Sequence, residues 1–317
     1  MTRLVNPIRN VAATADIIGT DFFASGPFTL LSYRHSYHAG NHADLIKHLV
    51  QTLLIEKLKT KDKPFIYIDT HSGGGLYDLA SEQANKTGEY HDGIAKLVNR
   101  GFSKSMPLPF AELVRELNAD QKKLRFYPGS PLIAQKLLRP QDKLLLMELH
   151  SKEVEVLQKN LQGDRRTRVL NQDGFASLIG ALPPKPARGM VLIDPSYELK
   201  EDYYHLVETI TDSVKRWPTG TFAIWYPILG KQRDRSGWLL RKLEKICQSN
   251  LLVAELTVDE QQPEFGMHGS GMAIINAPYQ LDQNIEKHLE LIHPKIAKNV
   301  DGKKLGGWKI QWIKESN

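Results

Sequence analysis

Short apolar runs alternate with longer segments of helical periodicity along most of the chain. Between residues 36 and 61 the apolar side chains recur every three or four positions, which predicts a helix that ends before Pro64. Continuous apolar runs at 65–68, 144–147 and 190–193 are too short for helices and are typical of buried strands. A further short strand is expected at 168–171.

Helical patterns separate these strands. One helix is predicted from Ser130, because Ser is a favoured N-cap residue and Pro131 suits the first helical position. Two more are expected at 151–162 and about 175–182. Strands that alternate with helices predict an α/β fold with a mostly parallel sheet covered on both faces. The later candidate strands have fewer helices between them, which predicts an antiparallel C-terminal edge. They are residues 221–226, 252–257, 271–275 and 308–313.

Acidic residues stand at the ends of four predicted strands, namely Asp69, Glu148, Asp173 and Asp194. In open α/β sheets ligands bind outside the carboxyl ends of the strands, so these positions are candidate site residues. Asp69 leads into a turn with three glycines, 73–75, which allow a sharp turn and a close approach of a ligand to the backbone. The chain lacks a Gly-Xaa-Gly-Xaa-Xaa-Gly fingerprint and a Gly-Lys-Ser/Thr motif at this turn, which argues against an ordinary NAD enzyme and a P-loop NTPase.

The second strand end suggests a nucleoside ligand. A carboxylate such as Glu148 accepts hydrogen bonds from both ribose hydroxyls, and Asp173 suits an exocyclic amine such as that of adenine. The usual distance from the glycine turn is about 20 residues, whereas Gly75 to Glu148 spans 148 − 75 = 73. The sequence therefore predicts an insertion at about 76–128, expected to be a small helical subdomain.

Composition narrows the class of protein. With 317 residues, 41% hydrophobic and 25% charged, the chain is neither disordered nor of low complexity. The single cysteine, Cys247, excludes intrachain disulfides and Cys-based zinc sites. No run of about 18 apolar residues indicates a membrane span. A net charge of +6 permits a polyanionic partner, and Lys and Arg concentrate at 231–245 and 295–314.

Residues 1–29 show no clear period. Asp16 and Asp21 interrupt the only candidate apolar core of a signal peptide, so we expect a flexible N-terminal extension on a cytoplasmic protein. A single catalytic domain is expected to occupy residues 30–317.

The tetrapeptide Asp194-Pro195-Ser196-Tyr197 suits methylation of an aromatic amino group. The lone pair of such an amine is delocalised into the ring, and two acceptors, the Asp194 carboxylate and the Pro195 carbonyl, would localise it toward a methyl donor. The Tyr197 ring would stack on the base, which must first leave its own stack.

These residues resemble the Asp-Pro-Pro-Tyr motif of amino-group methyltransferases. More closely, the chain is similar to the RlmJ family of 23S ribosomal RNA adenine-N6 methyltransferases from about residue 30 to its C-terminus. The similarity rests on four segments: residues 31–44 (LSYRHSYHAGNHAD), 69–75 (DTHSGGG), 127–131 (YPGSP) and 225–227 (WYP).

The resemblance implies a Rossmann-like class I methyltransferase that uses S-adenosylmethionine, without a metal, on 23S ribosomal RNA. That RNA would be free or in an early particle, and the enzyme a monomer with no membrane partner. Asp194, Pro195 and Tyr197 would be catalytic, and Tyr33 would contact the RNA. The implied cofactor-binding residues are His48, His71, Ser130, Glu148, Asp173, Gly174 and Asp194.

Other interpretations stay open at this point. Ser196 stands where the motif has its second proline, and serine gives the backbone of this turn more conformational freedom. One alternative is therefore an RNA-binding or assembly factor with weakened catalysis. A DNA adenine-N6 methyltransferase is another, because it shares the motif. His38 and His42 have the spacing of helical metal ligands but no evident third ligand. Asn276-Ala277-Pro278-Tyr279 resembles the motif but lies late in the strand order, and we interpret it as a turn.

Overall fold

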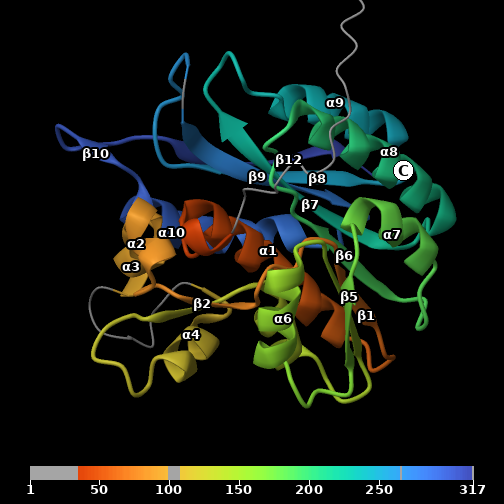
Figure 1. The fold of residues 1–317 in the computed structure, drawn as a ribbon. Helices are drawn as coiled ribbons and strands as arrows, with labels where there is room; N and C mark the ends of the chain where they lie inside the picture. The colour runs from red at the N-terminus through yellow and green to blue at the C-terminus, as the bar shows by residue number, and fades with distance from the viewer. Residues whose placement is uncertain (1–34, 99–107, 265, 316–317) are drawn as a thin grey trace, which may run out of the picture. The chain divides into compact units, whose positions relative to one another are not determined.

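The computed structural model describes residues 35–98, 108–264 and 266–315, so the predicted extension 1–29 and Tyr33 lie outside the described residues. An eight-stranded sheet runs through this part of the chain (Figure 1). In spatial order its strands are β12 (Gly307–Lys314), β8 (Leu251–Thr257), β9 (Met267–Ile275), β7 (Thr221–Leu229), β6 (Gly189–Ile193), β1 (Ile66–Asp69), β4 (Lys143–Glu148) and β5 (Thr167–Asn171).

The sheet is parallel from β7 to β5 and antiparallel from β7 to β12. This confirms the predicted mostly parallel sheet with an antiparallel C-terminal edge. The parallel strands place their carboxyl ends at one edge of the sheet, so Asp69, Glu148 and Asp194 meet there. The predicted strands are all present, each within a few residues of its expected bounds.

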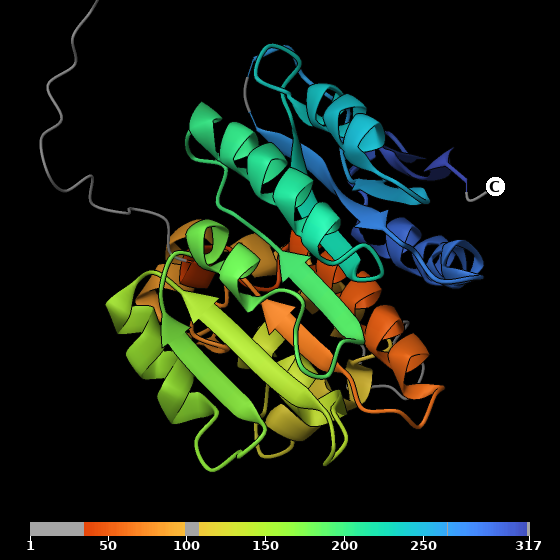
Figure 2. The same cartoon turned by 90° about the vertical axis from the view of Figure 1, so that its right-hand side faces the viewer.

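Helices cover both faces. One face holds α1 (His42–Lys59), α5 (Ser130–Leu137), α6 (Ser151–Asn160) and α10 (Leu281–Ile296). The other holds α7 (Gly174–Ala181), α8 (Lys200–Arg216) and α9 (Ser236–Ile246), the face toward the viewer in Figure 2. Alternate residues of each central strand enter the two cores: Tyr67 packs under α1, and Ile66 and Ile68 pack under α8. Burial on both faces explains why these strands are continuously apolar.

The insertion between β1 and α5 contains several short elements. They are β2 (Leu76–Asp78), α2 (Glu82–Thr87), the 3-10 turn η2 (Glu89–His91), α3 (Ile94–Val98), α4 (Ala111–Leu117) and β3 (Phe126–Pro128). β2 and β3 pair antiparallel and close the insertion at its base. A two-stranded hairpin, β10 (Asn299–Val300) with β11 (Lys303–Lys304), follows α10.

Two predicted helix starts differ from the structure. The predicted helix from 36 begins only at His42, after a 3-10 turn (η1, His35–Tyr37), because Asn41 caps it by accepting from the amides of Ala43 and Asp44. The predicted N-cap Ser130 is instead the first helical residue, after Gly129. The Ser130 hydroxyl donates to the Asp69 carboxylate at 2.7 Å, so it binds the end of β1 and does not cap the helix.

Candidate active site

Helix α1 carries a buried polar stripe toward the reacting edge of the sheet. Asp44, Lys47, His48 and Gln51 recur at helical spacing and are each at most 4% exposed, within a helix whose other inward residues are apolar. Sequence reasoning assigned a role only to His48. The spacing of polar residues inside an apolar helix is the signal that would have identified the other three.

Lys47 joins this stripe to the motif after β6. Its ammonium lies 2.6 Å from Oδ2 of Asp194 and 2.7 Å from Oδ1 of Asp44. Burial lowers the pKa of Lys47, but the two carboxylates raise it well above its usual value, so the lysine is charged. Burial raises the pKa of Asp44, yet its interactions with His35 and Lys47 hold that pKa well below its usual value. The buried ammonium of Lys47 therefore holds the Asp194 carboxylate in place from the α1 side.

The motif itself forms a strained turn. Tyr197 has a φ of 53°, a left-handed conformation that is uncommon for a bulky residue and costs about 1–3 kcal/mol. Its hydroxyl donates to the Trp225 carbonyl at 2.6 Å, and its ring lies 4.5 Å from that of Tyr203. These contacts offset the strain and fix the turn. The residue is 8% exposed, so the stacking role of Tyr197 stays a prediction.

Asp69 ends β1 in a fully buried site. Its carboxylate accepts from the hydroxyls of Ser130 (2.7 Å) and Tyr67 (3.0 Å) and from the amide of His71 (3.2 Å). Burial raises the pKa of Asp69 to about 6, although these hydrogen bonds oppose the shift. Gln51 completes the network, because its amide donates to Tyr67 at 3.0 Å.

Glu148 ends β4 and holds the glycine turn. Its two oxygens accept from the amides of Gly73 (2.7 Å) and His150 (2.8 Å). Burial raises the pKa of Glu148, and the two amide hydrogen bonds partly offset this. Each oxygen keeps a second lone pair that no hydrogen bond within the described residues uses, and its contact with a ribose stays a prediction.

Asp173, Gly174 and His71 lie side by side at this edge. Asp173 caps α7 through Oδ1, which accepts from the amides of Phe175 and Ala176, and no hydrogen bond within the described residues uses Oδ2. A Cβ at Gly174 would lie 2.0 Å from the Thr70 carbonyl oxygen, so only glycine fits there. The His71 ring packs 4.9 Å from Phe175, and burial lowers its pKa to about 4, which favours the neutral imidazole.

His48 is completely buried between the rings of Phe110 and Tyr127. Its Nδ1 lies 2.9 Å from the Tyr127 hydroxyl, and its Nε2 has no hydrogen bond. These contacts are interior, and a contact of His48 with the cofactor stays a prediction. Within the described residues, no group of three His, Cys, Asp or Glu side chains is placed to hold a metal ion. His38 instead pairs with Glu89 at 2.9 Å.

The structure thus brings together most of the sequence-derived site residues. Strand ends place Asp194, Glu148, Ser130 and His71 at the same edge of the sheet. Asn276 lies at the opposite edge, because β9 runs antiparallel to β7, and its side chain donates to the carbonyls of nearby loops. The Asn276 tetrapeptide is therefore the turn that we expected. No helix among residues 35–98, 108–264 and 266–315 is long and apolar enough to cross a membrane.

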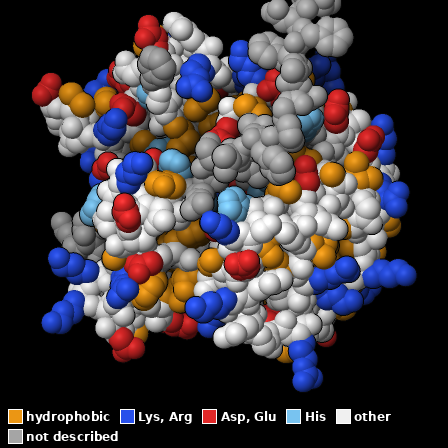
Figure 3. All heavy atoms as spheres, in the orientation of Figure 1, with side chains coloured by type: hydrophobic (Ala, Val, Ile, Leu, Met, Phe, Trp, Pro, Cys, Tyr) orange, Lys and Arg blue, Asp and Glu red, His pale blue; other side chains and the backbone are white. Residues whose placement is uncertain are grey.

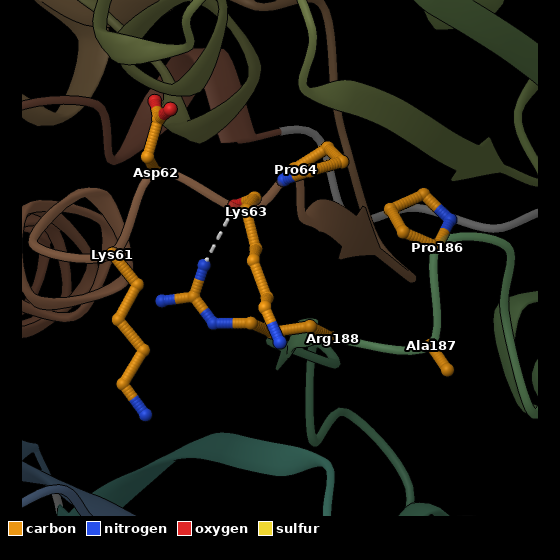
Figure 4. Close-up of a pocket in the computed structure, with 7 residues that line it drawn as sticks. All are labelled: Lys61, Asp62, Lys63, Pro64, Pro186, Ala187 and Arg188. Carbon is orange, nitrogen blue, oxygen red and sulfur yellow. Dashed lines mark hydrogen bonds between the residues drawn. The ribbon is translucent and has the colours of Figure 1, made fainter.

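A cavity of about 820 Å³ also lies at the amino ends of β1 and β6, away from Asp194 (Figure 4). Lys61, Lys63 and Arg188 line it together with short apolar side chains. The Arg188 guanidinium donates to the backbone carbonyls of Lys63, at 3.0 Å, and Leu58. The cavity is at the opposite edge from the strand-end acids, so it is not part of the candidate active site.

Comparison with known proteins identifies the family. The family model described as "Ribosomal RNA large subunit methyltransferase D, RlmJ" matches residues 62–314. Two relatives named "Ribosomal RNA large subunit methyltransferase J" are similar along their whole length. That of Haemophilus influenzae is 42% identical, over 90% of this chain and 99% of its own. That of Escherichia coli is 44% identical, over 88% of this chain and 99% of its own.

One solved structure has the same fold throughout. Protein LPL1258 from Legionella pneumophila is 35% identical, with a TM-score of 0.76 over 86% of this chain and 98% of its own. The resemblance seen in the sequence motifs is therefore confirmed, and the chain belongs to the RlmJ family of ribosomal RNA large subunit methyltransferases.

Proposed function

We propose that this protein transfers a methyl group from S-adenosylmethionine to the N6 amino group of an adenine in 23S ribosomal RNA. The observation that supports this best is the motif after β6. Its carboxylate, Asp194, is held by a buried lysine, and its aromatic residue, Tyr197, is held in a left-handed turn. Membership of the family gives the substrate class.

The strand-end residues suit the proposed cofactor. The glycine turn, the Glu148 carboxylate and the free oxygen of Asp173 match the parts of a nucleoside: backbone approach, ribose hydroxyls and an exocyclic amine. We propose that His71, Ser130, Glu148, Asp173 and Gly174 bind it, with His48 behind them. When bound, S-adenosylmethionine supplies an electrophilic methyl group on a sulfonium.

The catalytic work falls to three groups of the chain. Lys47 occupies Oδ2 of Asp194 at 2.6 Å, and no hydrogen bond within the described residues uses Oδ1. We propose that Oδ1 and the Pro195 carbonyl accept hydrogen bonds from the two N–H groups of the adenine amine, which localises the nitrogen lone pair for attack on the methyl group. The carbon–sulfur bond breaks as the nitrogen–carbon bond forms, the sulfur leaves as a neutral thioether, and the amine then loses one proton to water. The Tyr197 ring would lie against the base. Ser196 keeps the backbone carbonyl that this arrangement needs, so we expect activity.

We also propose that the protein acts in the cytoplasm as a monomer, on free 23S ribosomal RNA or an early particle, and that Tyr33 contacts the RNA. These points rest on the resemblance of the N-terminal motif and on the family's substrate. Mass mapping of adenine methylation in ribosomal RNA from a strain lacking the protein would identify the modified position.

The direct test is methyl transfer to undermodified 23S ribosomal RNA by the unaltered chain and by Asp194→Ala. We expect transfer to fall by at least a hundredfold in the variant. Equal rates would show that Asp194 is not at the reacting amine. A duplex DNA substrate measured in parallel distinguishes a DNA methyltransferase. Calorimetric binding of S-adenosylmethionine without transfer to either substrate would favour the weakened assembly factor.

A further inference from the structure

The proposed chemistry does not use a pair of aromatic side chains that lies near the carboxyl ends of the parallel strands. Tyr204 lies in the first turn of α8 and Trp238 in the first turn of α9. Their ring centroids are 5.1 Å apart, with planes at 69°. Both helices begin where the parallel strands β6 and β7 end, and the preceding residue, Tyr203, packs on Tyr197. Tyr204 therefore directly follows, in the sequence, a residue that packs on the motif.

The core uses only one member of this pair, because Trp238 is partly buried against it. α8 and α9 pack through Leu206, Ile210, Leu239 and Leu243, all fully buried. Tyr204, in contrast, remains 48% exposed. A large ring left at the surface near a candidate site, as that of Tyr204 is, is typical of contact with a ligand or partner rather than of core packing.

Several Lys and Arg residues lie on α9 and in the loop that precedes it. The Lys242 ammonium lies 5.5 Å from the centre of the Trp238 ring. Lys231, Arg233 and Arg235 lie in the loop between β7 and α9, and none of them forms an ion pair in the part of the chain that the structure describes. The acid of this loop, Asp234, is held by the amide of Ser236 and the side chain of Gln261, both at 2.9 Å.

Charges of both signs are mixed on the face that Figure 3 shows. In Figure 3, Lys and Arg side chains are spread around the visible face with Asp and Glu between them. RNA contact near the site therefore depends on local clusters rather than on one broad field.

We propose that Tyr204, Trp238 and Lys242 form a stacking site for an unpaired base next to the target adenine. Lys231, Arg233 and Arg235 then bind the phosphates that flank it. RNA-binding proteins recognise unpaired bases by stacking them on aromatic rings, and cations beside the rings track the backbone. When the target base leaves its stack to react, the neighbouring bases lose a stacking partner. One of these exposed bases is the ligand of the stacking site. The inference rests on the proposed ribosomal RNA substrate.

The first test is Tyr204→Ala with Trp238→Ala, measured by methyl transfer to in vitro transcribed 23S ribosomal RNA. We expect KM for RNA to rise about fivefold or more, because a base–aromatic stack is worth at least that factor. The dissociation constant of S-adenosylmethionine, measured by calorimetry, stays within about twofold and shows that the variant is folded. The variant Trp238→Phe, which keeps an aromatic ring, should have a KM for RNA close to that of the unaltered chain. An unchanged KM in the double alanine variant would refute the stacking site.

The second test reverses charge at the loop and, as a matched control, at the opposite edge. Arg233→Glu with Arg235→Glu is compared with Lys61→Glu with Lys63→Glu in the cavity of Figure 4. Each variant changes the net charge by the same amount. We expect the loop variant to raise KM by at least tenfold and to flatten the dependence of RNA affinity on salt, while the control changes KM by less than about threefold. Equal effects at both edges would overturn the phosphate assignment.

The two tests separate this inference from the function on which it rests. If the unaltered chain transfers no methyl group to ribosomal RNA, the proposed function fails. If it transfers normally and the variants keep its KM, only the stacking and phosphate sites fail.

Discussion

Replacing Lys47 with methionine is the sharpest test of how the motif is held. Methionine keeps the length and volume of the side chain but removes the ammonium between Asp194 and Asp44, at 2.6 and 2.7 Å. Breaking a buried ion pair by removing one partner costs about 3–5 kcal/mol. Asp194 retains 15% exposure, so water relieves part of the penalty, and we expect about 3 kcal/mol. For a chain of 317 residues, 1 kcal/mol shifts the midpoint of thermal unfolding by about 1.5 °C, so the midpoint should fall by roughly 4–5 °C.

Circular dichroism on heating measures this loss, and its pH dependence has a defined sign. The folded-state pKa of Asp44 is depressed, so its contribution to stability is present above its unfolded pKa and is lost as pH falls through the folded value. The difference between the two proteins should therefore persist from pH 7.5 to pH 5 and shrink only in stronger acid.

Two further measurements complete the Lys47 test. We expect kcat for methyl transfer to fall about a hundredfold in Lys47→Met, because the Asp194 carboxylate loses its fixed orientation. A double-mutant cycle with Asp44→Asn isolates the coupling between Lys47 and Asp44. An unfolding midpoint within about 2 °C of wild type, together with kcat within twofold, would refute the reasoning.

Three more predictions concern the other strand ends. Gly174→Ala brings a methyl group against the Thr70 carbonyl, at 2.0 Å in the unrelaxed backbone, and should destabilise the protein by about 1–3 kcal/mol while weakening S-adenosylmethionine binding; normal calorimetry and an unchanged midpoint would contradict this. Glu148→Gln leaves one oxygen where two amides now bind, at 2.7 and 2.8 Å, and should weaken cofactor affinity by about 10- to 100-fold, with Glu155→Gln, an exposed residue of α6, as the control. Asp69 has a folded-state pKa raised to about 6 from 3.8, so the unfolded state binds fewer protons between these values and stability falls as pH rises through that window, by roughly 3 kcal/mol. Asp69→Asn should remove this slope in urea unfolding at pH 4.5 and 7.5 without cofactor, and parallel profiles for the two proteins would count against it.

The sheet was predictable because its central strands are buried on both faces and therefore continuously apolar. Parallel pairing then dictates that the acids following those strands meet at one edge, which is how Asp69, Glu148 and Asp194 could be placed together before the structure was known. The antiparallel edge followed from the loss of helices between the last strands.

The remaining parts depend on contacts between distant residues. Lys47 and Asp194 are 147 positions apart. The pattern around Lys47 does not show that a lysine on an apolar helix will pair with a carboxylate from a distant strand end. Ser130 has the form of a helix cap, but its partner is the carboxylate of Asp69, 61 residues earlier, which only the fold brings near. The left-handed Tyr197 turn likewise depends on a carbonyl of β7.

The buried polar stripe of α1 has a consequence for laboratory evolution. The same helix fills the core beneath the sheet and supplies the charged groups behind the motif, and two of those groups, Asp44 and Lys47, form an ion pair with each other. A library randomised at Asp44 and Lys47 and selected only for folding should thus recover much of the same pair, because a lone survivor would be an uncompensated buried charge. Recovery of these residues under selection for activity consequently cannot be attributed to chemistry until the folding-only library has been sequenced beside it.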